Sequence, residues 1–307
     1  MHCLSHAPHE FYLVTRPGHP PGHAGRVGAL PWRDNVHEVP ESEVADGEFD
    51  CVLFQSYRHF VEDAPRVLSA AQRRLPTLYV EHDPPQQHPT GTLHPAGQRG
   101  IHLIHVTPFN ALMWDNGEAE VTVIEHGVPL PEAPLYSGAR AKGIVVVNNL
   151  RSRGRRLGCD LFEQMRRELP LQLVGMDSES LGGAGEIAND QLSAYIAQFR
   201  FFFNPIRYTS LGLAMLEAMA AGMPIVAFAT TEVPMVIRDG VNGYADTRPR
   251  QLEQAMRTLL DEPALARRLG EAARQTVSQR FSLQRFARDW DGVLRTAASC
   301  TNNGRQS

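Results

Sequence analysis

Short apolar runs alternate with amphipathic stretches along most of the chain. Apolar runs of a few residues predict buried strands, whereas apolar positions three or four residues apart predict helices. This alternation is typical of parallel sheets with helices on their faces, so the expected fold class is α/β. The predicted strands are 11–15, 51–55, 78–80, 103–106, 121–124, 143–147, 171–174, 201–203 and 225–228. The predicted helices are 64–75, 110–116, 160–168, 189–198, 211–221, 250–261 and 263–279, with a last amphipathic helix after them.

The alternation is interrupted at residues 129–141, which are rich in Pro, Ala and Gly and are typical of a linker. The length of 307 residues is also about two domains by the usual prior. We therefore expect an N-terminal domain over 1–135 and a C-terminal domain over 136–280. The last helix is expected over 281–298.

Residues 199–247 form the most informative segment, predicted as strand, loop, helix, strand and a second Gly-containing loop. Thr209 and Ser210 are residue types that cap helix N-termini. The tight turn before a helix leaves unpaired N–H groups at a positive dipole end, which favours anions, and Gly212 allows a ligand to approach closely. Glu217 lies in a mostly apolar helix and needs a polar partner, which a ribose diol could supply. The alternative interpretation is an ordinary capped strand–turn–helix unit.

The string from Thr209 to Pro224 resembles the signature of the group-1 retaining glycosyltransferases of the GT-B fold. That signature runs Glu, small, Phe, Gly, Leu, two variable residues, Leu, Glu, Ala, Met, Ala, variable, Gly, variable, Pro. The resemblance implies that Glu217 holds the nucleotide ribose. It also implies that the phosphate and sugar of the donor bind around Ser210, Leu211, Gly212 and Leu213.

One position departs from the signature. The first glutamate of the family, which contacts the donor sugar, falls on Thr209. A hydroxyl can hydrogen-bond a sugar but cannot stabilise positive charge as a carboxylate does. A different sugar preference, weakened chemistry and an inactive relative all remain open. By resemblance, His82, Thr209 and Glu217 are the expected catalytic residues.

A run of arginines follows the predicted strand 143–147. A guanidinium group can donate two parallel hydrogen bonds to the oxygens of one phosphate. Its positive charge also neutralises a diphosphate leaving group. The family places an Arg and a Lys in this loop, where the present chain has Asn149 and Leu157. We expect Arg151 and Arg156 to replace them, with Arg207 as a further candidate. The alternative is a solvated charge run.

Two other matches extend the resemblance. The strand and turn around Gly175 and Met176 are similar to the family's nucleotide-base region. His82 follows the strand 78–80 after Glu81 and resembles the strand-end histidine that faces the donor sugar. Ligand sites of parallel sheets do lie at strand carboxyl ends. A solvated loop histidine is the alternative for His82.

All thirteen histidines lie at or before His126. The pair His102 and His105, and the group around His82 and His88, match no metal motif. We therefore expect no dedicated metal site and no cofactor besides the donor substrate.

Composition and charge argue against several functional classes of protein. A net charge of −4 without an aromatic-interleaved basic block argues against nucleic-acid binding. No apolar run is long enough to span a bilayer, and no signal-peptide pattern is present. The scattered cysteines Cys3, Cys51, Cys159 and Cys300 indicate reduced thiols and a cytoplasmic location.

The family resemblance implies two Rossmann-like domains whose parallel sheets face each other across a cleft. It places helix 281–298 back on the N-terminal domain, in agreement with the apolar stripe of Phe286, Trp290 and Leu294. The implied reaction is metal-independent sugar transfer from a nucleotide diphosphate to an acceptor hydroxyl, with retention of configuration. Glycan, lipid-linked and small-molecule acceptors stay open, as does peripheral membrane contact.

Two other functions are weighed against this one. The first is a catalytically inactive nucleotide-sugar- or glycan-binding homologue. The second, a dinucleotide-dependent dehydrogenase, requires a GxGxxG after a strand, and Gly182–Gly185 does not fit that context.

The start of the chain differs from the family. Members usually open with a strand and a Gly-rich loop, whereas residues 1–6 suggest no strand and residues 16–28 are rich in Gly and Pro. We expect an incomplete N-terminal domain, a start that is assigned too late, or an acceptor site that is built in another way. In the first case the sheet would have a bare edge, through which a homo-oligomer could form.

Overall fold

The computed structural model describes residues 2–28 and 30–305, with side chains as far as residue 299. The chain forms two compact units, Val128–Ser282 and Met1–Gly127 with Leu283–Ser307. The boundary falls near residue 127 and not at 135, because the linker docks on the C-terminal unit. The N–H groups of Leu135 and Tyr136 both donate to the Ala221 carbonyl, at 3.1 and 3.0 Å.

The C-terminal unit contains a five-stranded parallel sheet in the order β11-β10-β9-β7-β8. Every residue of β9 and β10 is buried, which explains the apolar runs at 201–203 and 225–228 in the sequence. The strands are β7 Arg140–Val146, β8 Leu171–Val174, β9 Phe199–Asn204, β10 Ile225–Phe228 and β11 Gly243–Asp246. The sequence did not predict β11, which has few apolar residues and lies where a turn was expected.

The helices of this unit enclose the sheet in one hydrophobic core. α6 is buried on most of its surface, which explains why its sequence is apolar on all sides. The helices are α3 Leu150–Arg153, α4 Cys159–Met165, α5 Asn189–Ile196, α6 Leu213–Ala221, α7 Val233–Val236, α8 Pro249–Asp261 and α9 Pro263–Arg280. Two 3₁₀ helices, η5 Gly154–Leu157 and η6 Ser178–Leu181, follow β7 and β8.

The N-terminal unit contains a four-stranded parallel sheet, β3-β4-β5-β6, and a separate parallel pair, β1-β2. β2 was not predicted, because three of its five residues are His, Glu and Pro, and only Val36 is fully buried. The strands are β1 Phe11–Thr15, β2 Val36–Pro40, β3 Val52–Phe54, β4 Thr77–Glu81, β5 Ile101–His105 and β6 Glu120–Val123.

Short helices connect these strands. The predicted helix 64–75 is wrong, since Leu68 takes up an extended conformation and divides it into two pieces. The helical segments are η1 His2–His6, η2 Glu41–Asp46, η3 His59–Asp63, α1 Ala64–Val67, η4 Gln72–Arg74 and α2 Pro108–Met113.

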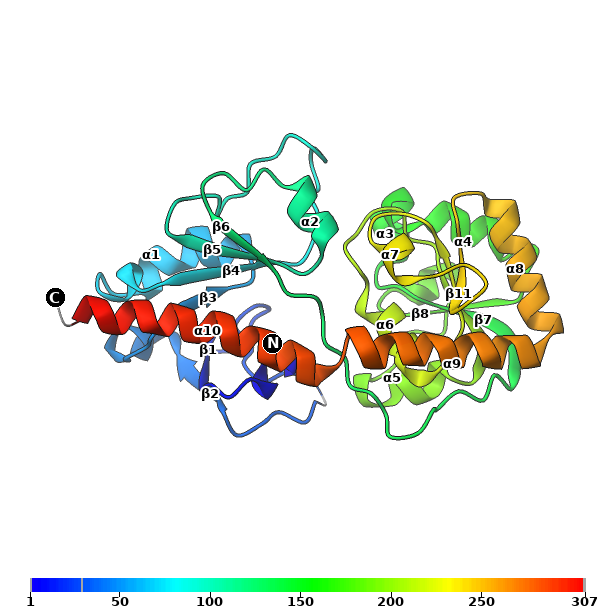
Figure 1. Cartoon of the computed structure of the whole chain (residues 1–307), viewed down its shortest axis with the longest axis horizontal. Coiled ribbons are helices and arrows are strands. Elements are labelled where there is room, and N and C mark those ends of the chain that lie inside the picture. Colours follow the sequence, from blue (N-terminus) through cyan, green and yellow to red (C-terminus); the bar gives the residue numbers. More distant parts are fainter. Residues whose placement is uncertain (1, 29, 306–307) are drawn as a thin grey trace. The chain divides into compact units, whose positions relative to one another are not determined.

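The last helix, α10 Leu283–Arg305, belongs to the N-terminal unit (Figure 1). Its side chains Phe286, Trp290 and Leu294 are buried in one core with Leu78 of β4 and Ile104 of β5. Within residues 2–28 and 30–305, none of the helices combines the length and apolar character needed to cross a bilayer.

Candidate functional site

The order of strands indicates where a ligand should bind in the C-terminal unit. From β7 the chain moves to β8 on one side, and then crosses to the other side of β7 to form β9. In open parallel sheets, ligands bind beyond the carboxyl ends of the strands at such a reversal. The two connecting loops at this point are 147–158, which includes the short helices α3 and η5 and carries the arginine run, and 205–212, which leads into α6.

These two loops are joined through their backbones. The N–H groups of Arg207 and Tyr208 donate to the Arg156 carbonyl, at 3.0 and 3.2 Å. Gly158 has φ +82 and lies so close to Pro205 that a Cβ atom would come within 2.0 Å of its carbonyl oxygen. The contact requires glycine, and the loops are held together as one surface.

The N-terminus of α6 opens onto this surface. The helix begins at Leu213, and its N-cap is Gly212, which forms no side-chain cap. The prediction that Thr209 or Ser210 caps the helix is therefore wrong. In the described part of the chain, no group accepts a hydrogen bond from the backbone N–H of Gly212, Leu213 or Ala214. Unpaired amides at a positive helix end form a site for an anion.

Glu217 lies further along the same helix. It is half-buried, and burial raises the pKa of its carboxyl group above the usual range. Among the described residues, none forms a hydrogen bond or an ion pair with this carboxylate. A half-buried carboxylate without a partner is costly, so a ligand that brings hydroxyl donors would be favoured here.

The residues before the helix differ in exposure. Thr209 is half-buried, Ser210 and Leu211 are buried, and Leu213 is 45% exposed. The Ser210 carbonyl accepts a hydrogen bond from the Thr231 hydroxyl at 3.4 Å. The loop is thus anchored on its inner side.

The three predicted phosphate-binding arginines have different surroundings. Arg151 is exposed, donates to the Ser180 carbonyl at 2.5 Å, and lines an open pocket with Arg166 and Arg167. Arg156 is half-buried, and its carbonyl joins the two loops.

Arg207 is held by an ion pair. Its guanidinium donates to both carboxylate oxygens of Asp160, at 2.6 and 2.9 Å, and to the Arg155 carbonyl at 2.7 Å. The guanidinium also lowers the pKa of the Asp160 carboxyl. Three of its hydrogen bonds therefore brace the loop, which leaves fewer for a phosphate.

The turn after β8 is tied to the end of β7. The Met176 N–H donates to Asn148 Oδ1 at 2.9 Å, and the Asn149 N–H donates to the Met176 carbonyl at 2.7 Å. At Gly175, φ is +128, and a Cβ atom would come within 2.7 Å of the Val147 carbonyl oxygen. The Met176 side chain is 43% exposed, so an apolar surface is accessible beside the reversal.

His82 belongs to the N-terminal unit, directly after β4. Its Nε2 lies 3.1 Å from Gln55 Oε1, and its ring stacks on His126 with centroids 6.4 Å apart. Surrounding protein atoms displace water and lower the pKa of His82, and burial lowers the pKa of His126 to about 4. The lowered pKa favours the uncharged form of both imidazoles, although the His82 side chain is itself exposed to solvent.

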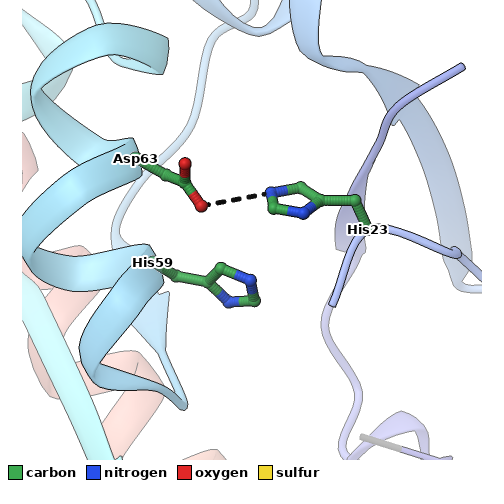
Figure 2. Close-up of side chains that lie close together, drawn as sticks. All are labelled: His23, His59 and Asp63. Atoms are coloured by element: carbon green, nitrogen blue, oxygen red, sulfur yellow. Dashed lines mark ion pairs between the residues drawn. The ribbon is translucent and has the colours of Figure 1, made fainter. Parts of the chain in front are cut away.

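The histidines first considered as metal ligands serve other partners. His102 bonds the Thr122 hydroxyl at 2.8 Å, and His105 bonds Asn116 Oδ1 at 2.7 Å. The structure instead brings together a set that sequence reasoning missed, namely His23, His59 and Asp63 (Figure 2). The four-residue spacing of the last two on one helix was the only signal for them in the sequence.

Known proteins resemble the C-terminal unit in sequence. Residues 145–262 match the family model described as glycosyl transferases group 1. The α-maltose-1-phosphate synthase of Mycobacterium tuberculosis is 34% identical over 100 residues, which cover 30% of this chain and 26% of that enzyme. The match thus spans about a quarter of that relative.

Solved structures extend the likeness to both units. Sucrose-phosphate synthase from Thermosynechococcus elongatus has a TM-score of 0.64 at 18% identity, over 82% of this chain and 74% of that one. HepE from Anabaena, solved with UDP, has a TM-score of 0.62 at 17% identity, over 85% and 86% of the two chains. At these identities the likeness shows the fold.

Proposed function

We propose that this chain transfers a sugar from a nucleotide-diphosphate donor to an acceptor hydroxyl with retention of configuration. It carries a group 1 glycosyltransferase domain on a GT-B fold. One observation carries the proposal: among the described residues, nothing pairs with the N–H groups of Gly212, Leu213 and Ala214 at the start of α6 or with the carboxylate of Glu217. A diphosphate suits the amides and a ribose diol suits the carboxylate. A nucleotide-diphosphate sugar has both groups in one molecule.

In this proposal the protein stabilises the departing diphosphate by electrostatics. The amides and dipole at the start of α6 face the charge that develops as the sugar–phosphate bond breaks. Arg151 and Arg156 add guanidinium donors from the neighbouring loop, while Arg207 supports that loop through Asp160. With amides and guanidinium groups in these roles, the transfer needs no metal ion.

Contacts to the sugar and the base complete the donor site. Thr209 and Ser210 would hydrogen-bond the sugar hydroxyls, and the apolar surface of Met176 after Gly175 would accommodate the base. His82, which the family resemblance assigns to the donor sugar, is the remaining proposed residue, since a neutral imidazole can both donate and accept a hydrogen bond.

The proposals for the donor nucleotide and for the cellular compartment have less direct support. HepE was solved with UDP-glucose, so uridine donors come first in any screen. The described cysteines Cys3, Cys51 and Cys159 are thiols and not disulfides, which supports a reducing compartment such as the cytoplasm. Acceptor hydroxyls of glycans, lipid-linked sugars and small molecules are all within the proposal.

A thermal-shift screen against UDP, GDP, ADP, TDP and their sugar conjugates tests the donor site. One nucleotide series should raise the melting temperature by mass action. Glu217→Gln should weaken that binding, because a hydrogen bond to a charged group contributes about 1.5–3 kcal/mol, or roughly 10–100-fold in Kd. The matched control is Glu271→Gln, an exposed carboxylate on α9, which should bind as the unaltered protein does.

The outcomes separate the competing functions. A folded protein that no nucleotide stabilises would contradict the donor site. Donor binding without transfer or hydrolysis would favour the non-catalytic homologue. Where a product forms, the anomeric proton coupling in its NMR spectrum reports whether configuration is retained.

A further inference from the structure

Two imidazoles and a carboxylate from separate segments converge in the N-terminal unit (Figure 2). His23 lies in the loop after β1, whereas His59 and Asp63 lie at the two ends of η3. One donor atom of each lies within 4.8 Å of the other two. From this arrangement we propose that His23, His59 and Asp63 bind one Zn²⁺ ion.

The spacing of the donor atoms fits a small ion. Ligands at about 2.0–2.2 Å from a tetrahedral Zn²⁺ lie roughly 3.3–3.6 Å from one another. His23 Nε2 and Asp63 Oδ2 are 3.4 Å apart. The His59 ring meets the His23 ring edge-on, with centroids 4.7 Å apart. Since His59 is only half-buried, a small side-chain rotation brings its nitrogen to the same ion.

One oxygen of the Asp63 carboxylate is hydrogen-bonded, whereas the other only faces the His23 ring across 3.4 Å, the pair joined by a dashed line in Figure 2. Oδ1 accepts hydrogen bonds from Arg16 and Arg66, each at 2.7 Å. Oδ2 is buried, and no described group donates a hydrogen bond to it, the nearby His23 imidazole included. The Asp63 side chain is 8% exposed, so water does not replace the missing donor freely. A buried carboxylate oxygen without a donor is an unfavourable arrangement that a metal ion would correct.

The outer residues hold the carboxylate in place. Arg16 also pairs with Glu41, at 2.7 Å between Nε and Oε2, and Arg66 approaches Glu41 at 3.4 Å. Two guanidinium groups thus face two carboxylates. The charges of these four side chains sum to zero, so as a group they do not repel a cation. Such outer partners commonly orient metal-binding carboxylates.

The donor set indicates the type of ion. Two imidazoles with one carboxylate suit Zn²⁺, and three protein ligands leave one position for water. The ion would join the Gly- and Pro-rich loop after β1 to η3. The proposal does not depend on the transferase function, because none of the three ligands belongs to the donor site.

Zinc binding to the full-length chain without an affinity tag tests the proposal. The protein is stripped with a chelator, loaded with ZnSO₄, desalted and analysed for bound metal, and its affinity is measured by competition with a chromophoric chelator. One equivalent of Zn²⁺ should stay bound. His23→Ala and His59→Ala should each weaken binding by more than the roughly 10–100-fold that loss of an outer partner costs.

The matched control is His19→Asn. His19 is exposed, lies in the same loop as His23, and has φ +48, which asparagine tolerates. This variant should keep the equivalent of zinc, and circular dichroism shows whether each variant is folded. If His23→Ala does not fold, His59→Ala decides the matter.

Two results would overturn the site. The first is an unaltered protein that retains no zinc after desalting. The second is a folded His59→Ala that binds zinc as tightly as His19→Asn does. Substitution by Co²⁺ gives an independent readout, since a tetrahedral site with two imidazoles should produce an intense visible absorption that the His59→Ala variant lacks.

Discussion

Gly158→Ala is the substitution whose effect the structure specifies most closely. Gly158 is the N-cap of α4, with φ +82 and ψ 28. Alanine in this left-handed conformation costs about 1–2 kcal/mol. Its Cβ would also lie 2.0 Å from the Pro205 carbonyl oxygen and 2.6 Å from the carbonyl carbon. These are backbone atoms that cannot rotate away, so relieving the contact adds about 1–3 kcal/mol.

A second glycine of this unit separates the two contributions. Gly222, the C-cap of α6, has nearly the same conformation, with φ +89 and ψ 26, but a Cβ atom there would meet its nearest neighbours at an ordinary contact distance of 3.5 Å. Gly222→Ala should therefore lose only the conformational part, about 1–2 kcal/mol, whereas Gly158→Ala should lose roughly 2–5 kcal/mol in total. The difference between the variants measures the contact with Pro205.

The assay must report on the C-terminal unit. The three tryptophans, Trp32, Trp114 and Trp290, all belong to the N-terminal unit, so their fluorescence follows the wrong part of the chain. Urea unfolding followed by far-ultraviolet circular dichroism, with hydrogen exchange at α4 and α6, reports the relevant transition. Equal losses of unfolding free energy in the two variants would refute the steric argument.

Three further predictions follow from particular contacts. Trp290→Ala should lower the free energy of unfolding of the N-terminal unit by about 3–5 kcal/mol. Arg288→Ala, on the exposed side of α10, should change it by less than about 0.5 kcal/mol. Circular dichroism in urea measures both. Because the folded-state pKa of Glu217 is raised, stability of the C-terminal unit should fall as pH rises from the usual carboxyl range through that raised value. Glu217→Gln should remove this fall in stability. Urea unfolding midpoints measured across the acidic pH range test this, and the same pH dependence in the variant would contradict it. Arg207→Ala should return the pKa of Asp160 toward its ordinary value, and an unchanged carboxyl titration by NMR would contradict the ion pair.

The sequence predicts strands well where burial is complete. Ile225–Phe228 has the predicted bounds, because a strand covered on both faces is a continuous apolar run. Val36–Pro40 was missed, since three of its five residues are polar or proline and only Val36 is fully buried. Local propensity also failed for the helix expected over 64–75, where tertiary packing selects an extended Leu68.

The candidate site was predictable only where its residues are close in sequence. Gly212 caps the helix that carries Glu217, so the spacing of these two residues along the chain is enough to indicate a ligand site. The roles assigned to His82, Arg151 and Arg156 stay predictions. His23 and His59 meet through the packing of a loop on η3, and no periodic pattern records a contact over so many residues.

The order of segments along the chain has a consequence for synthesis. The C-terminal unit is continuous, whereas the N-terminal unit is completed by α10, which the ribosome produces after it. Until α10 emerges, the surface of Leu78 and Ile104 that Phe286 and Trp290 cover stays exposed to solvent. A nascent chain that has reached residue 282 therefore carries one finished unit beside one open apolar surface, a state prone to aggregation and open to capture by chaperones.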